Sequence, residues 1–165
     1  MSNNHDPGED VRVILSETGE WIRNADTKTG LLATVLAVLL GVISQKAENK
    51  DIIPPFSDAT DYVGFCFLVV TVGAIVVSYF FFYRVLSPRV AVPDADTRFA
   101  WPWIAHSSVA TLVNLTPSAA REEGWTQAKA LALITQEKFR YFKRGLVTSA
   151  ISGVFFLVWL VIIST

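Results

Sequence analysis

Basic and flat aromatic side chains gather in the polar stretches that border the apolar parts of this chain. The cations are Arg23, Lys28, Arg84, Arg89, Arg98, Lys138, Arg140, Lys143 and Arg144, and the rings are Trp21, Trp101, Trp103, Trp125, Phe139 and Tyr141. Arg and Lys bind phosphate, and an aromatic ring stacks on a planar base. This combination suits a small anion that carries a planar base. It is also typical of an interfacial belt of a membrane protein.

The stretch WIRNADTK separates these two interpretations better than the cations do. Asn24 and Asp26 contribute nothing to lipid anchoring, and a carboxylate beside anionic lipid is mildly unfavourable. Asp26 pairs with Lys28 or with a base on the helix at 117–144, or else it contributes specificity toward a ligand. Trp21, Arg23, Asn24, Asp26 and Lys28 are therefore candidate ligand-binding residues on this stretch.

Other kinds of site find little support in the sequence. There is no nucleophile elbow, HExxH motif or glycine-rich phosphate loop, so we do not expect an enzyme. His5 and His106 lie in different segments, and the single cysteine, Cys66, lies inside an apolar run. These residues predict no metal site, no cofactor and no intrachain disulfide. The net charge of −1 gives no indication of a nucleic-acid polymer as partner.

Three apolar runs must position the candidate residues, at Gly30–Ser44, Tyr62–Tyr83 and Gly145–Thr165. None of the 14 Lys and Arg or the 15 Asp and Glu residues falls within them. A helix needs about 20 residues to cross the hydrocarbon core of a bilayer. The second and third runs meet that length, and the first does so if its helix extends to Ala47. We therefore predict an all-α membrane protein with three transmembrane helices.

The distribution of Lys and Arg predicts how the chain crosses the membrane. Residues 1–29 carry three of them, residues 84–144 carry nine, and residues 45–61 carry two against four acids. Basic segments stay on the cytoplasmic side. The N-terminus and residues 84–144 are thus expected to be cytoplasmic, in a multi-pass protein of the cell inner membrane. The acidic N-terminal stretch MSNNHDPGED does not resemble a cleavable signal peptide.

Helix signals describe the polar segments. DPGE predicts a helix start with Pro7 in the first turn, and an apolar stripe from Val11 to Ala25 then recurs at helical spacing. Thr116 and Pro117 predict a second start, of a helix that continues toward the third span. Between them we expect a loop, with Pro88 and Pro93, and a short helix from Trp103 to Asn114.

These signals divide the chain into six parts. We expect a cytoplasmic amphipathic helix at 1–29, spans at 30–47, 62–83 and 145–165, a short external loop at 48–61, and a cytoplasmic helical sensing region at 84–144. The N-terminal helix and the sensing region together are expected to form a small cytoplasmic helical bundle.

Two of these segments resemble signatures of the Pycsar transmembrane effector family. WIRNADTKTGLLATVLAVLLG is similar to the family's amphipathic helix ending in Ala-Asp-x-Lys directly before the first span. QAKALALITQEKF is similar to its second signature, a Gln followed by Lys-aromatic ahead of the last span. The match places Ala25, Asp26, Lys28, Gln127, Lys138 and Phe139 on motif positions. One departure is Leu131, where the family pattern leads us to expect a polar residue.

The resemblance implies an antiphage function. A partner pyrimidine cyclase would make cyclic UMP or cyclic CMP, which the effector would bind before impairing the membrane and causing abortive infection. Gln127, Lys138 and Phe139 thereby join the candidate ligand-binding residues. The function also suggests a homo-oligomer. Two alternatives remain: a membrane adaptor or structural subunit that binds a protein partner through its cytoplasmic helices, and a holin-like lysis protein with no ligand.

Overall fold

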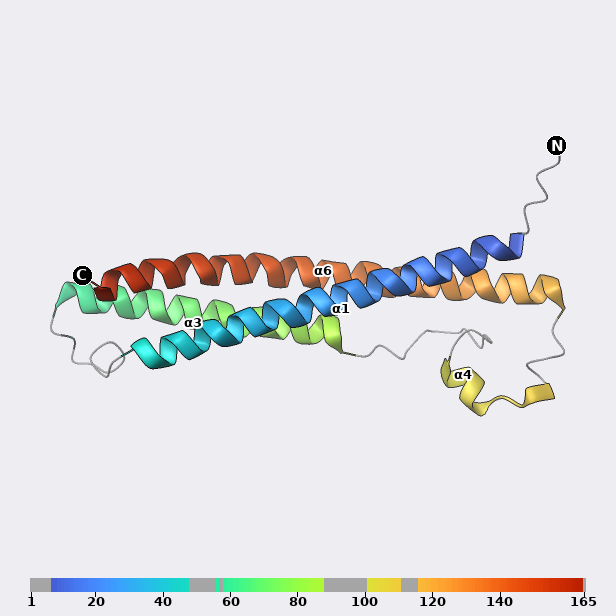
Figure 1. Ribbon diagram of the computed structural model, residues 1–165, viewed down its shortest axis with the longest axis horizontal. Helices are drawn as coiled ribbons and strands as arrows, with labels where there is room; N and C mark the ends of the chain where they lie inside the picture. The colour runs from blue at the N-terminus through green and yellow to red at the C-terminus, as the bar shows by residue number, and fades with distance from the viewer. Residues whose placement is uncertain (1–6, 48–55, 57, 88–100, 111–115, 165) are drawn as a thin grey trace, which may run out of the picture. The chain divides into compact units, whose positions relative to one another are not determined.

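The computed structural model describes residues 7–47, 56, 58–87, 101–110 and 116–164. Its helices are α1 (Pro7–Lys46), α3 (Ala59–Leu86), α4 (Trp101–His106) and α6 (Pro117–Ser164), and the described residues contain no strand (Figure 1). The expected all-α class is therefore confirmed. Most of the predicted external loop, and the predicted loop around Pro88 and Pro93, lie outside the described residues.

The long helices begin where the sequence predicts. α1 starts at Pro7, whose fixed φ suits the first turn of a helix. α6 starts at Pro117, and Thr116 caps it. The carbonyl oxygen of Thr116 accepts from the Ala120 N–H at 3.0 Å, and its Oγ1 accepts from the Ala119 N–H at 3.4 Å. The Oγ1 contact satisfies one of the backbone donors that a helix start leaves unpaired, and the Ala120 contact is the first hydrogen bond of the helix itself.

The short helix before α6 differs from its prediction. α4 begins at Trp101, earlier than expected, and ends at His106; Val109 and Ala110 are again helical, and residues 111–115 lie outside the described residues. The Ser107 N–H donates to the Ile104 carbonyl oxygen at 3.3 Å, a turn-like contact that closes the helix. Two serines follow in succession, and serine hydroxyls compete for backbone groups, which favours turns over helix interiors. The predicted helix was therefore wrong in running unbroken through Ser107 and Ser108, and its expected end at Asn114 lies outside the described residues.

Three of the described helices are long and apolar enough to cross a membrane, namely α1, α3 and α6. α1 has 40 residues and α6 has 48, whereas a span needs about 20. Each therefore includes a polar segment that continues as one helix into its apolar run. Gly19 and Gly30, which could have bent α1, do not interrupt it. The prediction that the helix from Pro117 continues toward the third apolar run is confirmed, and α1 likewise continues from its polar segment into the first run.

The chain divides into two compact units, and both long helices contribute to each. The first unit contains Met1–Asn24 and Ser87–Lys138, and the second contains Ala25–Leu86 and Phe139–Thr165. The division falls directly before Ala25 on α1 and directly after Lys138 on α6. It thus passes through both stretches that carry the candidate ligand-binding residues.

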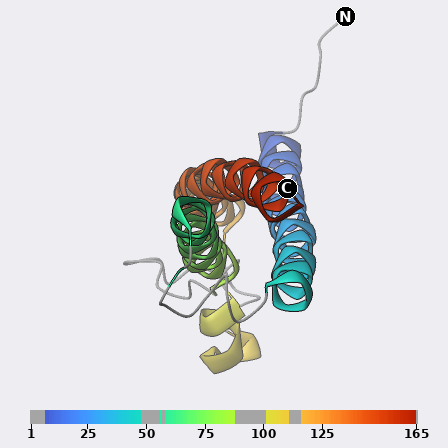
Figure 2. The same cartoon turned by 90° about the vertical axis from the view of Figure 1, so that its left-hand side faces the viewer.

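The second unit is a bundle of three helices, which Figure 2 shows end-on. The buried residues of α3 are Gly64, Leu68, Thr71, Ile75, Ser78, Phe82 and Val85. Their spacing alternates regularly between four and three residues, which is the heptad seam of a helix packed against helical partners. The core combines residues from all three helices: Leu36, Ile43, Leu68, Ile75, Phe82, Phe156 and Trp159.

Polar contacts and one close approach set the register of this bundle. The Tyr79 hydroxyl of α3 donates to the Ala33 carbonyl oxygen of α1 at 2.8 Å. The Ser78 hydroxyl donates to Thr148 Oγ1 of α6 at 2.7 Å. Gly145 of α6 faces Phe82 so closely that a Cβ there would lie 2.5 Å from the phenyl ring. These contacts define which turns of the three helices lie at the same level.

Candidate functional site

Asp26 and Lys28 are the candidate residues that α1 contributes to the second unit. They lie beside two buried residues, Ala25 and Thr29. Thr29 is fully buried, and its hydroxyl donates to the Ala25 carbonyl oxygen at 2.7 Å. Asp26 follows Ala25 and is half-buried, whereas Lys28 is exposed. Ala25 of the Ala-Asp-x-Lys stretch and Thr29, which follows the stretch, thus lie in the packing, with the Asp26 carboxylate at its edge.

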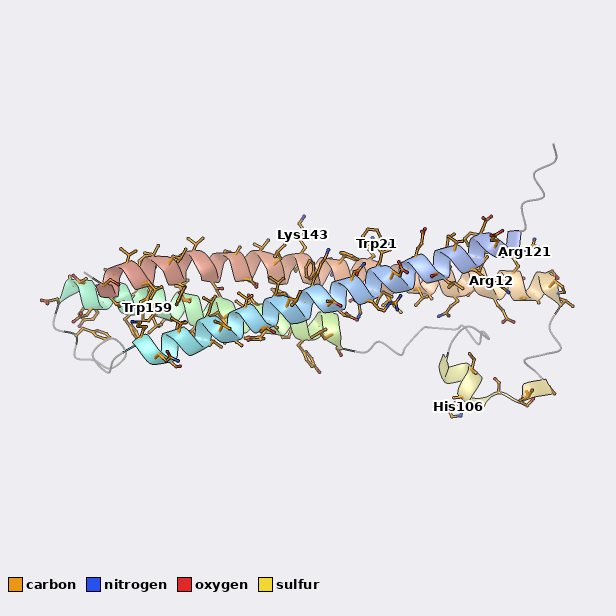
Figure 3. The ribbon with its side chains drawn as sticks, viewed as in Figure 1. Arg12, Trp21, His106, Arg121, Lys143 and Trp159 are labelled. Atoms are coloured by element: carbon orange, nitrogen blue, oxygen red, sulfur yellow. The ribbon has the colours of Figure 1, made fainter. Side chains whose placement is uncertain are left out.

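The candidate residues of the first unit on α1 are exposed. Trp21 is 59% exposed and projects from the helix surface (Figure 3), and Asn24 is also exposed. The Arg23 guanidinium lies 3.9 Å from the Glu20 carboxylate, and both side chains are largely in solvent. An exposed pair one helical turn apart contributes little to stability. Arg23 therefore remains available to other anions.

The candidate residues on α6 are the buried ones. Gln127 and Lys138 belong to the first unit and are each 7% exposed. They are eleven residues apart, so on an α-helix they differ by only about 20° in direction and lie about 16 Å apart along the axis. Both therefore occupy one buried face of α6. Phe139, in the second unit, is half-buried.

The structure thus separates the candidate residues by burial. It brings Gln127 and Lys138 onto one face, leaves Trp21, Arg23, Asn24 and Lys28 exposed, and places Asp26 and Phe139 between these extremes. A buried amide and a buried ammonium group need polar partners, since lysine is rarely buried without one. Among the residues that the structure describes, no three His, Cys, Asp or Glu side chains gather in a way that could hold a metal ion.

Two features were missed by the sequence interpretation. Thr29 was not a candidate, although it lies one turn after Ala25 on the continuing packed stripe. Arg84 and Tyr141 were both noted as members of the basic and aromatic set, but not as partners. Arg84 Nη2 donates to the Tyr141 hydroxyl at 3.2 Å, and the guanidinium carbon lies 5.2 Å from the centre of the ring. Neither sequence separation nor composition indicates this pair.

The comparison with protein families yields one match, and it spans nearly the whole chain. The model described as the Pycsar effector protein domain matches residues 10–165. No curated protein and no solved structure matches the chain. The family match covers both signature stretches, and three described helices suit a membrane. The chain therefore belongs to the Pycsar effector family, and it is a transmembrane effector of antiphage defence linked to a cyclic-nucleotide signal.

Proposed function

We propose that this effector binds a cyclic pyrimidine mononucleotide, cyclic UMP or cyclic CMP, made by a partner cyclase, and then impairs the inner membrane so that infection is aborted. In this proposal the N-terminus and the region 84–144 are cytoplasmic, and the active form is a homo-oligomer. The observation that carries it is the burial of Lys138 and Gln127 on one face of a helix that continues into the third candidate span.

The chemistry of these two side chains fits a nucleotide. A lysine ammonium group makes charge-assisted hydrogen bonds to phosphate oxygens, and the cyclic phosphodiester of a mononucleotide carries one negative charge. The amide of Gln127 has two donor hydrogens and an acceptor oxygen, which suit the polar edge of a base. The half-buried ring of Phe139 offers a surface for stacking.

The separation of Gln127 and Lys138 limits how one ligand could meet both. About 16 Å along the helix axis is a long way for one mononucleotide. A single ligand contacts both side chains only if they extend toward each other. We therefore assign the phosphate to Lys138 as the primary contact and treat Gln127 as a separately testable one.

The continuity of α6 offers a route from binding to the membrane. Its packed positions follow the same four-and-three spacing on both sides of Lys138, through Leu131 and Thr135 before it and Gly145 and Ser152 after it. A helix without a break transmits a rotation or shift of one end to the other. A ligand changes the bundle in this way only if it binds one arrangement more tightly.

The test is calorimetric binding of cyclic UMP, cyclic CMP, cyclic AMP and cyclic GMP to the full chain in detergent. Tight binding of one pyrimidine nucleotide, with both purine nucleotides much weaker, would support the proposal. Lys138→Ala removes a charge-assisted contact worth about 1.5–3 kcal/mol, so we expect affinity to fall roughly 10- to 100-fold. Lys129→Ala is the matched control, because Lys129 is exposed on the same helix and in the same unit.

Two results would contradict the proposal. Unchanged affinity of the Lys138→Ala variant would remove Lys138 from the site. The absence of binding of any cyclic nucleotide to a protein that is helical by circular dichroism would favour the adaptor function, and a stable copurifying protein would then be expected.

A further inference from the structure

Basic side chains from all three helices of the second unit surround the end of the bundle where α1 and α6 enter it. They are Lys28 of α1, Arg84 of α3, and Arg140, Lys143 and Arg144 of α6. We call these five residues the cationic collar. All of them are exposed. The collar is distinct from Lys138, which is buried and belongs to the first unit.

Contacts within the second unit place the collar residues at one level. Arg84 donates to Tyr141, and Gly145 lies against Phe82, so the end of α3 is level with residues 141–145 of α6. On the other side, Tyr79 reaches the carbonyl oxygen of Ala33. α1 and α3 run in opposite directions here. The residue five positions before Ala33 therefore lies opposite the residue five positions after Tyr79. Lys28 is therefore level with Arg84.

The geometry of α6 directs its three cations outward. At 100° per residue, Arg140, Lys143 and Arg144 fall within about 60° of the direction opposite Lys138. Figure 3 shows Lys143 pointing away from α1 and α3, in agreement with its exposure. Arg84 is held in place by the hydroxyl and ring of Tyr141. The collar therefore presents its charge to the surroundings of the bundle.

Basic residues outnumber acidic residues around the collar. In the described part of the second unit the acids are Asp26, Asp58 and Asp61. Asp58 and Asp61 lie at the start of α3, at the opposite end of that helix from Arg84. Two described acids lie near the collar, Asp26 on α1 and Glu137 on α6 one turn before Arg140, so the five cations outnumber them. The apolar run of each helix begins or ends within two residues of the nearest collar residue, at Gly30, Tyr83 and Gly145.

We infer that the cationic collar binds the phosphates of anionic phospholipids. When the apolar runs fill the hydrocarbon core, the collar lies in the headgroup layer of one leaflet. Exposed basic residues at that depth attract anionic lipid, with a free energy that adds up over the side chains. A free phosphate ester, including that of a nucleotide, has the same chemistry, but the outward direction of the α6 cations favours the lipid.

The experiment compares lipid binding by three forms of the full chain. Delipidated protein in detergent is exposed to equal amounts of phosphatidylglycerol and phosphatidylcholine, and bound lipids are counted by native mass spectrometry. The collar variant is Arg140→Gln/Lys143→Gln/Arg144→Gln. The control variant is Arg12→Gln/Arg121→Gln/Lys129→Gln, which removes three exposed cations of the first unit and changes the net charge equally.

We expect the parent and the control variant to prefer phosphatidylglycerol, and the collar variant to lose roughly fivefold or more of that preference. The parent's preference should also shrink in 1 M NaCl, where the screening length is about 3 Å. Equal losses in both variants would overturn the inference, because net charge alone would then explain the preference.

Nucleotide binding by the same variants separates this inference from the proposed function. The collar variant retains Lys138 and Gln127, so it should bind a cyclic pyrimidine nucleotide as the parent does. If it instead kept its lipid preference and lost nucleotide binding, the collar would belong to the nucleotide site and the lipid inference would be wrong. If no form bound nucleotide, the lipid result would stand on its own.

Discussion

Gly145 is the residue at which a single methyl group should disturb the membrane bundle most clearly. A Cβ at this position would lie 2.5 Å from Cε1 and 2.7 Å from Cδ1 of Phe82. Phe82 is buried in the core of the bundle, so its ring has no free space to enter. In Gly145→Ala, either the ring leaves its preferred rotamer or α6 moves away from α3. Overpacking of this kind costs about 1–3 kcal/mol.

Gly153 provides the matched control on the same helix. A Cβ there meets nothing within 4 Å. Gly153→Ala therefore gains helix propensity, about 1 kcal/mol in a helix interior, without a clash. Gly145→Ala has the same gain, so the difference between the two variants isolates the clash with Phe82.

The assay is thermal unfolding in one detergent at fixed concentration, followed by circular dichroism. For a chain of this length 1 kcal/mol corresponds to about 2–4 °C, so Gly145→Ala should unfold roughly 2–12 °C below Gly153→Ala. Adding Phe82→Leu should recover part of that difference, because the shorter side chain leaves room for the methyl group. Equal unfolding temperatures of the two alanine variants would refute the reasoning, since α6 and α3 would then not approach as closely as the structure has them.

Two further predictions concern polar groups inside the same bundle, and both use the same unfolding assay. The Trp159 indole is fully buried and its Nε1 has no hydrogen-bond partner among the described residues, so Trp159→Phe should cost much less than the about 3–5 kcal/mol expected for Trp159→Ala. A Phe variant as unstable as the Ala variant would mean that the indole N–H is satisfied. The Ser78–Thr148 bond should give a coupling of about 0.5–1.5 kcal/mol in a double-mutant cycle with Ser78→Ala and Thr148→Val, and strict additivity would contradict it.

Much of the fold follows from local features of the sequence. Uncharged runs of sufficient length predict spans, because the hydrocarbon core excludes charge over a known thickness. Helix starts at Pro7 and Pro117 were predictable because a cap and a fixed φ act within a few residues. The end of α4 was not predicted correctly. The pair of serines that follows it favours a turn over a helix only slightly, so the sequence signal for the end is weak.

The candidate site shows where this local reasoning ends. Composition and position placed Lys138, Arg140, Lys143 and Arg144 in one basic set, and only the family resemblance made Lys138 a candidate ligand-binding residue. The structure buries Lys138 and exposes the other three. Consecutive residues point to all sides of a helix, so only the position of a partner helix determines which of them is buried.

The same limit applies inside the membrane. The apolar runs are hydrophobic all round, so their composition gives no packed face. The sequence alone thus determined that three helices suit a membrane and which of their ends are basic. Only the tertiary structure decided that Gly145 rather than Gly153 meets α3, and that Ser78 pairs with Thr148, because these depend on the register of helices distant in sequence.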